Sequence, residues 1–152
     1  MLEQQVRELD IDDLSEIVNR MRDAGFEAGW NGNIEFNTGY VADQVAMMLS
    51  SDDWLVIGSE DVGAVFIANI DSTWFTPSLH AFEMFFYVHP DLRNRGYMQE
   101  LISRYVKWAE SKGAVKINIG VNLGINNQIG NYLCGKCGFE RSGLNFVRTV
   151  EK

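Results

Sequence analysis

The sequence predicts an α/β fold formed as one domain over residues 1–152. Segments with a strand pattern alternate along the chain with segments that have a helix pattern. The strand pattern is an alternating or continuous apolar run, and in the helix pattern apolar residues recur at helical spacing. Segment 82–121 contains a strand, a loop, a helix and a further strand, an order that favours a parallel crossover. The chain is 46% hydrophobic and 22% charged, which suits one core, and no repeat, low-complexity tract or linker divides it.

A strand and a helix are expected at the N-terminal end. The strand covers residues 4–9. A helix follows because the apolar residues of segment 14–21 recur at helical spacing. Asp13 and Glu16 have the spacing of a capping box at its start, and Gly25 is expected to end it.

A loop, a second helix and two strands are expected next. Segment 26–39 is rich in glycine and asparagine, which is typical of a loop. Apolar residues at helical spacing then predict a helix over residues 38–49. Strands are expected over residues 54–59 and 62–70, with a tight turn at Glu60-Asp61.

The second half begins with a loop that leads into a long strand. Residues 71–79 contain Ser, Thr and Pro and are expected to form the loop, whereas residues 80–88 are largely apolar and predict the strand. Helical spacing over residues 98–109 predicts a helix that ends at Lys112-Gly113. Residues 115–121 alternate in polarity and predict another strand.

The C-terminal segment predicts two further elements. A shorter helix is expected over residues 126–137. A closing strand or hairpin around Gly143 is expected over residues 139–150.

A short basic loop joins the strand at 80–88 to the helix that follows it. It runs Arg93-Asn94-Arg95-Gly96-Tyr97-Met98. A glycine loop that opens a helix leaves backbone N–H groups exposed, and the positive end of the helix lies beside them. Arg93 and Arg95 add two positive charges. We therefore expect this loop to bind an anion such as a pyrophosphate.

This loop resembles the acyl-CoA loop of the GNAT family of N-acetyltransferases. The signature of that family is Arg or Gln, two residues, Gly, one residue, then Gly or Ala. Arg93 and Gly96 fit the signature, and Met98 stands in its third place. The family also favours a strand that ends in Val-x-Pro before the loop, which Val88-His89-Pro90 supplies.

A second resemblance to the same family lies in the C-terminal helix. Family members usually carry Asn, then Ala three residues later, then Leu-Tyr, and end the helix in Gly-Phe. Asn127, Leu133 and Gly138-Phe139 match, whereas Gly130 replaces the Ala and Cys134 replaces the Tyr. The resemblance implies a GNAT-like mixed central sheet of about six or seven strands flanked by about four helices, with a splayed central strand pair.

The resemblance further implies an N-acetyltransferase that moves an acetyl group from acetyl-CoA to a primary amine by direct transfer in a ternary complex. Backbone groups around Tyr87 and Val88 would bind the pantetheine arm and polarise the thioester. The amides of residues 93–98 would hold the pyrophosphate. The coenzyme-binding residues implied in this way are Tyr87, Val88, Arg93, Asn94, Arg95, Gly96, Tyr97, Met98 and Asn127.

Glu83 is the first candidate for a general base. A carboxylate in an otherwise apolar strand is costly unless it is paired or functional, and family members often place a glutamate on this strand. The alternative is a Glu that faces solvent from the sheet. His80 is a second candidate, as a base or as an acceptor-binding residue, because histidine titrates near neutral pH. A structural role at the edge of the loop is the alternative for His80.

Cys134 stands where the family tyrosine commonly protonates the departing thiolate. Its thiol could do the same, or it could be a packing residue, in which case water would protonate the thiolate. Cys134 and Cys137 also form a CxxC pair. A redox pair is normally placed at a helix N-terminus, whereas this pair lies near a helix C-terminus. A zinc site needs two further ligands at suitable spacing, so no metal site is predicted.

Charge is divided unevenly along the chain. Residues 1–83 contain 3 Lys and Arg against 16 Asp and Glu, and residues 84–152 contain 10 against 5. A basic second half suits an anionic coenzyme, and an acidic first half would attract a cationic acceptor. An acidic surface that only keeps the protein in solution is the alternative. In the family the first two helices and their connection form much of the acceptor site, so Trp30 and Phe36 are candidate acceptor-binding residues or, alternatively, core aromatics.

Other classes of function are disfavoured by composition. The net charge is −8, whereas duplex nucleic acid usually requires a basic face. No apolar stretch approaches the roughly 20 residues of a membrane span, and no secretory signal is evident. A cytoplasmic protein without a membrane or nucleic-acid partner is expected, and a homodimer is left open.

Two rival functions are left open beside the enzyme. One is a catalytically weak or inactive GNAT-fold module that binds acyl-CoA or a protein partner, which the residues at 98 and 134 leave open. The other is a partner-binding protein that uses Trp30, Trp74 and Phe75 as anchors. The acceptor of an active enzyme could be a polyamine, an aminoglycoside or a protein lysine, and the sequence does not choose among them.

Overall fold

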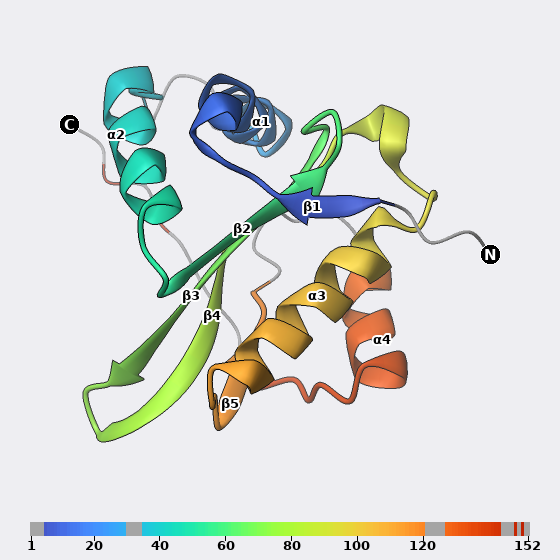
Figure 1. Cartoon of the computed structure of the whole chain (residues 1–152). Helices are drawn as coiled ribbons and strands as arrows, with labels where there is room; N and C mark the ends of the chain where they lie inside the picture. The colour runs from blue at the N-terminus through green and yellow to red at the C-terminus, as the bar shows by residue number, and fades with distance from the viewer. Residues whose placement is uncertain (1–4, 30–34, 121–126, 144–147, 149, 151–152) are drawn as a thin grey trace.

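The computed structural model describes residues 5–29, 35–120, 127–143, 148 and 150. These residues form one sheet of five strands in the order β1-β2-β3-β4-β5, with two helices on each side of it (Figure 1). Strands β1 to β4 are antiparallel to their neighbours, and β4 and β5 are parallel. The elements are β1 (Val6–Glu8), α1 (Leu14–Glu27), α2 (Thr38–Leu49), β2 (Trp54–Ser59), β3 (Ala64–Thr73), β4 (Thr76–Val88), α3 (Tyr97–Ser111), β5 (Lys116–Asn118) and α4 (Asn127–Lys136).

The predicted α/β fold with a mixed sheet is confirmed. The described residues contain five strands where six or seven were expected. The predicted parallel crossover from β4 through α3 to β5 is present. As the sequence predicts, α2 begins at Thr38, where the Asn37 side chain accepts a hydrogen bond from the N–H of Tyr40 at 2.9 Å. The predicted end of α3 is also found: Lys112 is its C-cap residue, and Gly113 follows in the left-handed conformation with a φ of 84°.

The sheet has a hydrophobic core on each face. Helices α1 and α2 cover one face, where Ile17 and Val45 are buried against Val65 of β3. Helix α3 covers the other face, where Leu101 is buried in a cluster with Phe66. Strand β3 contributes to both clusters, which explains why its sequence is a continuous apolar run.

The predicted capping box of α1 is wrong. Asp13 makes no capping hydrogen bond to α1. Instead, Asp10 and Asp13 form a capping box around the short 3-10 turn Ile11–Asp13 that precedes the helix. The Asp13 carboxylate also accepts hydrogen bonds from Arg7 at 2.9 and 3.0 Å, and this interaction lowers the pKa of Asp13. The carboxylate is therefore committed to β1 and to the turn.

The end of α1 also differs from the prediction. The helix passes through Gly25, which is buried, and continues to Glu27. Gly29 has a φ of 79°, the left-handed conformation that favours glycine after a helix. The helix therefore extends by two residues, and these two residues include the carboxylate of Glu27.

Strands β3 and β4 form a longer hairpin than the sequence predicts. Residues 71–79 were expected to form a loop, but Asp71 pairs with His80 and Thr73 pairs with Thr76. The turn consists of Trp74 and Phe75, and the hairpin extends well beyond β2 (Figure 1). Its outer part is exposed on both faces, so its polar residues give no apolar alternation.

The C-terminal strand expected over residues 139–150 is not found in the part that the structure describes. Residues 139–143, 148 and 150 form no helix or strand, and residues 144–147 and 149 lie outside the described part. The strand expected over residues 115–121 is limited to Lys116–Asn118. Among the described residues, no helix is long and apolar enough to span a membrane.

Candidate functional site

Strands β4 and β5 separate part-way along β4. They pair over residues 80–82 and 116–118, where β5 ends. Strand β4 continues to Val88 and stays paired on its other side with β3 (Figure 1). Within the described part of the chain, the edge of residues 83–88 that faces away from β3 has no strand partner. The splayed strand pair expected from the sequence is confirmed, and the space beside this edge is called the gap below.

Backbone groups of β4 face the gap. In an antiparallel pair, alternate residues direct both of their backbone groups to the same neighbouring strand. The N–H of His89 donates to the C=O of Gly63 at 2.8 Å. The alternation therefore assigns the backbone of Tyr87 to β3 and directs the backbone N–H groups of Phe86 and Val88 into the gap.

A β-bulge lies where the two strands separate. Met84 is an extra residue between Glu83 and Phe85, which pair with consecutive residues of β3. The bulge changes which side chains face α3. Ala81 before it and Phe86 after it both belong to the core cluster under α3, although they are an odd number of residues apart. Counting positions along a regular strand would therefore misplace one end of β4.

Glu83 lies at the point of separation. Its Oε2 atom accepts a hydrogen bond from the N–H of Gly120, just beyond β5, at 3.2 Å. The side chain is half-buried, and burial raises the pKa of Glu83 to about 7, although this hydrogen bond acts in the opposite direction. Burial and then the charge of Glu83 raise the pKa of Tyr105 on α3, whose hydroxyl donates to the C=O of Asn118 at 2.7 Å. The gap thus contains a carboxyl group that titrates near neutral pH.

The loop after β4 presents a row of backbone N–H groups. Asn94 at φ 64° and Gly96 at φ 92° adopt the left-handed conformation, and α3 begins at the next residue. The N–H of Arg93 donates to the C=O of Pro90 at 3.3 Å. For the N–H groups of residues 94–98, the described part of the chain supplies no acceptor. Adjacent free donors at the start of a helix form an anion-binding site.

Comparison with known sequences identifies the family. The family model of the acetyltransferase (GNAT) family matches residues 17–139. The chain belongs to the GNAT family. None of the curated proteins matches the sequence.

Solved acetyltransferase structures share the fold. An aminoglycoside acetyltransferase from an uncultured soil metagenomic sample, in complex with sisomicin, has a TM-score of 0.70 at 14% identity, with 97% of this chain and 96% of that chain covered. A ribosomal-protein-alanine N-acetyltransferase from Brucella melitensis gives 0.66 at 16%, with 95% and 98% covered. A predicted acetyltransferase from Clostridium acetobutylicum with acetyl-CoA gives 0.71 at 18%, with 94% and 95% covered.

In this GNAT chain the Arg93 side chain is directed toward α1. Its Nε donates to the C=O of Val88 at 2.9 Å. Its Nη2 contacts the two carboxylate oxygens of Glu27 at 2.7 and 2.8 Å. The guanidinium also lies 5.7 Å from the centre of the Tyr87 ring. The sequence analysis expects the charge of Arg93 to lie beside a bound pyrophosphate. In the structure this charge is paired with the carboxylate of Glu27.

Tyr87 is part of the same contact. Its side chain is buried, and its hydroxyl donates to Glu27 at 2.9 Å. Burial, followed by the hydrogen bond to Glu27, raises the pKa of Tyr87 to about 12. Glu27 was missed by the sequence analysis because it is 60 residues from Tyr87 and 66 from Arg93 along the chain. Local spacing carries no signal for such a contact.

The predicted acceptor residues of the GNAT chain are only partly described. Trp30 lies outside the described residues. Phe36 is half-buried just before α2, with the Arg22 guanidinium 5.4 Å from the centre of its ring. His80 lies in the closed part of the strand pair, stacked on Phe82 with ring centres 6.1 Å apart. The structure thus describes two of the three side chains, Phe36 just before α2 and His80 on β4.

Helix α4 carries the remaining family positions. Asn127 is its first residue, and the side chain of Asn127 lies outside the described part. Leu133 is buried, whereas the next residue, Cys134, is exposed. The Cys137 thiol is free and half-buried, and burial followed by a hydrogen bond with this thiol raises the pKa of Tyr132. Among the residues that the structure describes, no group of three or more His, Cys, Asp or Glu could hold a metal ion.

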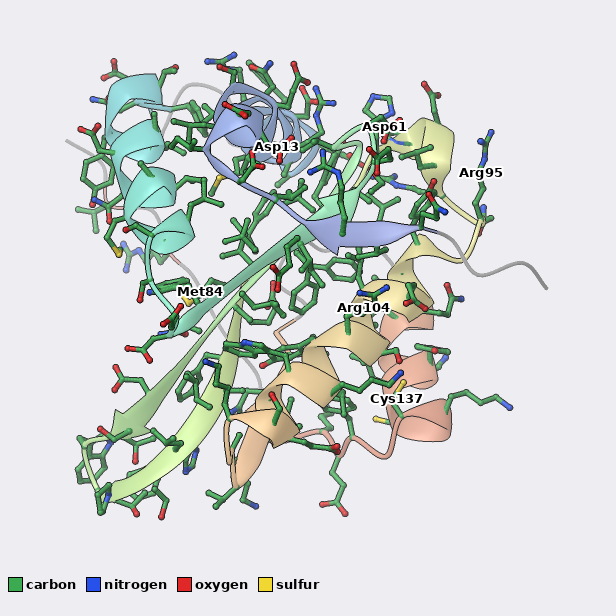
Figure 2. All side chains as sticks on the ribbon, viewed as in Figure 1. Asp13, Asp61, Met84, Arg95, Arg104 and Cys137 are labelled. Carbon is green, nitrogen blue, oxygen red and sulfur yellow. The ribbon has the colours of Figure 1, made fainter. Side chains whose placement is uncertain are left out.

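The remaining predicted residues lie on the loop after β4, in the first turn of α3 and at the turn between β3 and β4. Arg95 is exposed and projects outward from the loop (Figure 2), and Met98 is half-buried in the first turn of α3. Trp74 and Phe75 are 95% and 64% exposed at the hairpin turn.

A cavity of about 340 Å³ lies at the edge of β2 between the ends of α2 and α3, with Trp54 and Trp108 in its wall. That cavity contains none of the predicted site residues.

Proposed function

We propose that this GNAT chain is an N-acetyltransferase that transfers an acetyl group from acetyl-CoA to a primary amine, by direct transfer in a ternary complex. The observation that carries the proposal is the arrangement along β4. Its free edge, the Glu83 carboxyl group and the row of free N–H groups at residues 94–98 follow one another from the gap to the start of α3. We propose that residues 1–152 work as a single catalytic domain.

The loop fits the diphosphate of coenzyme A. The N–H groups of residues 94–98 have no acceptor in the described part of the chain, and the positive end of α3 faces the same place. Exposed Arg95 adds a positive charge. Met98 contributes its backbone N–H, so its side chain does not remove a donor. The N–H groups of Phe86 and Val88 would bind the pantetheine arm and the thioester oxygen, so Val88 keeps the role expected of it and Phe86 takes the place of Tyr87.

Acetyl-CoA supplies a thioester carbonyl carbon and a thiolate leaving group. An amine must be neutral to attack this carbon, and in water a primary amine is mostly protonated at neutral pH. Glu83 would accept the proton of the ammonium group directly or through water, because a base with a pKa near 7 is effective at neutral pH. The nitrogen–carbon bond then forms as the carbon–sulfur bond breaks, and the nitrogen gives up its second proton to water to become a neutral amide.

The thiolate needs a proton at the end of the reaction. Cys134 occupies the family position for the donor, and it is exposed on α4. Water reaches an exposed position as well, so we propose that water supplies this proton when the thiol does not. The same substitution supports the rival function, a GNAT module that binds acyl-CoA without turnover.

We propose a cationic acceptor, because the acidic first half of the chain contains α1 and α2. Phe36 and Trp30 would contact it, with His80 as a further candidate. Related folds are described as acting on aminoglycosides and on a ribosomal protein, and both kinds of acceptor carry cationic amines. We also propose a cytoplasmic location, with which the two free cysteines agree.

Two measurements test the proposed function. Calorimetry with acetyl-CoA measures coenzyme binding, and release of free thiol over a panel of polyamines, aminoglycosides and lysine peptides measures turnover. Binding with turnover of at least one amine supports the enzyme. Binding without turnover would support the binding module instead, and a protein that does not bind acetyl-CoA would exclude both.

A further inference from the structure

We infer that Glu27 is a positioning residue that holds the coenzyme-binding loop in place through Arg93. In this inference Arg93 anchors the start of the loop and does not itself contact the diphosphate. The inference rests on the proposed function, because it assigns a role in coenzyme binding. It concerns two residues on elements that are far apart in the sequence, the last residue of α1 and the first residue of the loop.

Three contacts fix the Arg93 side chain. Its Nε donates to the C=O of Val88 at 2.9 Å, which ties the loop back to the end of β4. Its Nη2 is 2.7 and 2.8 Å from the carboxylate oxygens of Glu27, which ties it to α1. Its guanidinium lies 5.7 Å from the centre of the Tyr87 ring, within reach of a cation–π interaction. The planar guanidinium is therefore held at its Nε, at one terminal nitrogen and over its face.

Glu27 is fixed as firmly as its partner. One carboxylate oxygen accepts hydrogen bonds from both the Tyr87 hydroxyl at 2.9 Å and Arg93 at 2.8 Å. The side chains of Arg93 and Glu27 are 35% and 27% exposed, so solvent screens their pairing only in part. The Tyr87 side chain is buried on β4. Its hydroxyl thus orients the carboxylate that holds Arg93.

The direction in which the Arg93 guanidinium points favours a role as anchor of the loop over a role as ligand of the coenzyme phosphates. It points toward α1, which packs on the face of the sheet opposite to α3. The free N–H groups that would bind an anion lie at the start of α3.

The test is a double-mutant cycle on the dissociation constant of coenzyme A, measured by calorimetry. Glu27→Gln and Arg93→Gln should each weaken coenzyme A binding about tenfold, the order expected for loss of a charge-assisted hydrogen bond. The double variant should bind no more weakly than either single variant, because both changes release the same contact. Glu16→Gln, an exposed residue at the start of the same helix, is the matched control and should bind as the wild type does.

The direction of the change in coenzyme A affinity distinguishes the two roles of Arg93, anchor of the loop and ligand of the phosphates. If Arg93 were a ligand of the phosphates, Glu27→Gln would release it and tighten binding, or leave binding unchanged, and either result overturns the inference. Arg93→Lys gives a second test, since lysine keeps the charge but lacks the Nε donor and the planar fork. An anchor predicts weak binding for this variant, whereas near wild-type binding would overturn the inference.

Thermal unfolding of each variant separates a local effect from loss of fold. An anchor predicts that coenzyme A affinity falls in variants whose melting temperature stays within a few degrees of the wild type. Coenzyme A affinity that falls only in proportion to lost folded protein would overturn the inference. Failure of the proposed function would be seen in the wild type and in Glu16→Gln themselves, because both would then either fail to bind coenzyme A or bind it without acetylating any amine of the panel.

Discussion

The carboxylate of Glu83 accepts a hydrogen bond from the N–H of Gly120 at 3.2 Å, at the place where β4 and β5 separate. The contact closes the narrow end of the gap. Glu83 directly precedes the bulge at Met84, after which the opposite set of β4 side chains faces α3. The carboxyl group is therefore held beside the gap by two strands that no longer pair with each other.

Replacing Glu83 with Gln should slow the reaction and leave coenzyme binding intact. Glutamine keeps the shape and a hydrogen-bond acceptor for Gly120, but it cannot take a proton from the amine. We expect kcat to fall about 100-fold, the scale of general base catalysis, with an unchanged dissociation constant for acetyl-CoA. Glu110→Gln, an exposed residue near the end of α3, is the control. An unaltered kcat would remove Glu83 from the mechanism.

The pH dependence of activity should follow the ionisation of Glu83. Burial raises its pKa to about 7, so the basic form becomes available as the pH rises through 7. The wild-type kcat is expected to rise over this range and to level off above it. Residual activity of Glu83→Gln should lack this rise, and a rise of the same midpoint in the variant would assign it to another group.

The same ionisation should affect stability with the opposite sign. The folded-state pKa of about 7 lies above the ordinary value of 4.5, so between these values the folded protein binds more protons than the unfolded protein. The free energy of unfolding therefore falls as the pH rises from 4.5 to 7. We expect a loss of about 1–3 kcal/mol from this group. Denaturant unfolding of wild type and Glu83→Gln at pH 5 and pH 8 measures it, and equal pH slopes would contradict the raised pKa.

Gly96→Glu should weaken coenzyme binding strongly. Gly96 has a φ of 92°, which a side chain tolerates poorly, and a carboxylate at this place repels phosphate. We expect acetyl-CoA to bind at least about tenfold more weakly, since strain and repulsion each contribute on the order of 1 kcal/mol.

Gly113→Glu is the matched control for Gly96→Glu. Gly113 lies just beyond the other end of α3 and has a φ of 84°, and a Cβ atom at this position would meet no other atom within 4 Å. The variant should lose about 1 kcal/mol of stability and keep its acetyl-CoA affinity. Equal losses of affinity in both variants would show that the effect comes from strain in α3 as a whole.

Cys134→Ala is expected to change the rate little. The thiol is exposed, so water has access to the same place and can protonate the thiolate. We expect less than a threefold decrease in kcat with the best amine of the panel, which is a small change on the scale of general acid catalysis. A decrease of about 100-fold would instead make the thiol the proton donor.

Local features of the sequence predicted most of the fold. The helical spacing over α3, the glycines at its two ends and the apolar run of β3 each act through neighbouring residues, and these predictions hold. The predictions that were wrong depend on contacts with other parts of the chain. Asp13 has the right spacing to cap α1, but Arg7 and the preceding turn use its carboxylate. The polar hairpin end at residues 71–79 is a strand because it pairs, which alternation on one strand cannot show.

The site was harder to predict than the fold. The loop at residues 93–98 is contiguous, so its glycine and its place before a helix were visible in the sequence. The link between Glu27 and Arg93 joins residues 66 positions apart and depends on α1 extending past Gly25. The orientation of the β4 backbone depends on the bulge at Met84 and on register with β3. Neither property can be obtained from spacing along one segment.

The most direct test of the central claim is the response of individual backbone amides to coenzyme A, measured by nuclear magnetic resonance on the uniformly labelled protein. We predict that the largest shifts occur at the N–H groups of residues 94–98 and of Phe86 and Val88, with little change near Trp54 at the cavity beside β2. Saturable shifts that leave residues 94–98 unaffected, or no shifts at all, would contradict the claim.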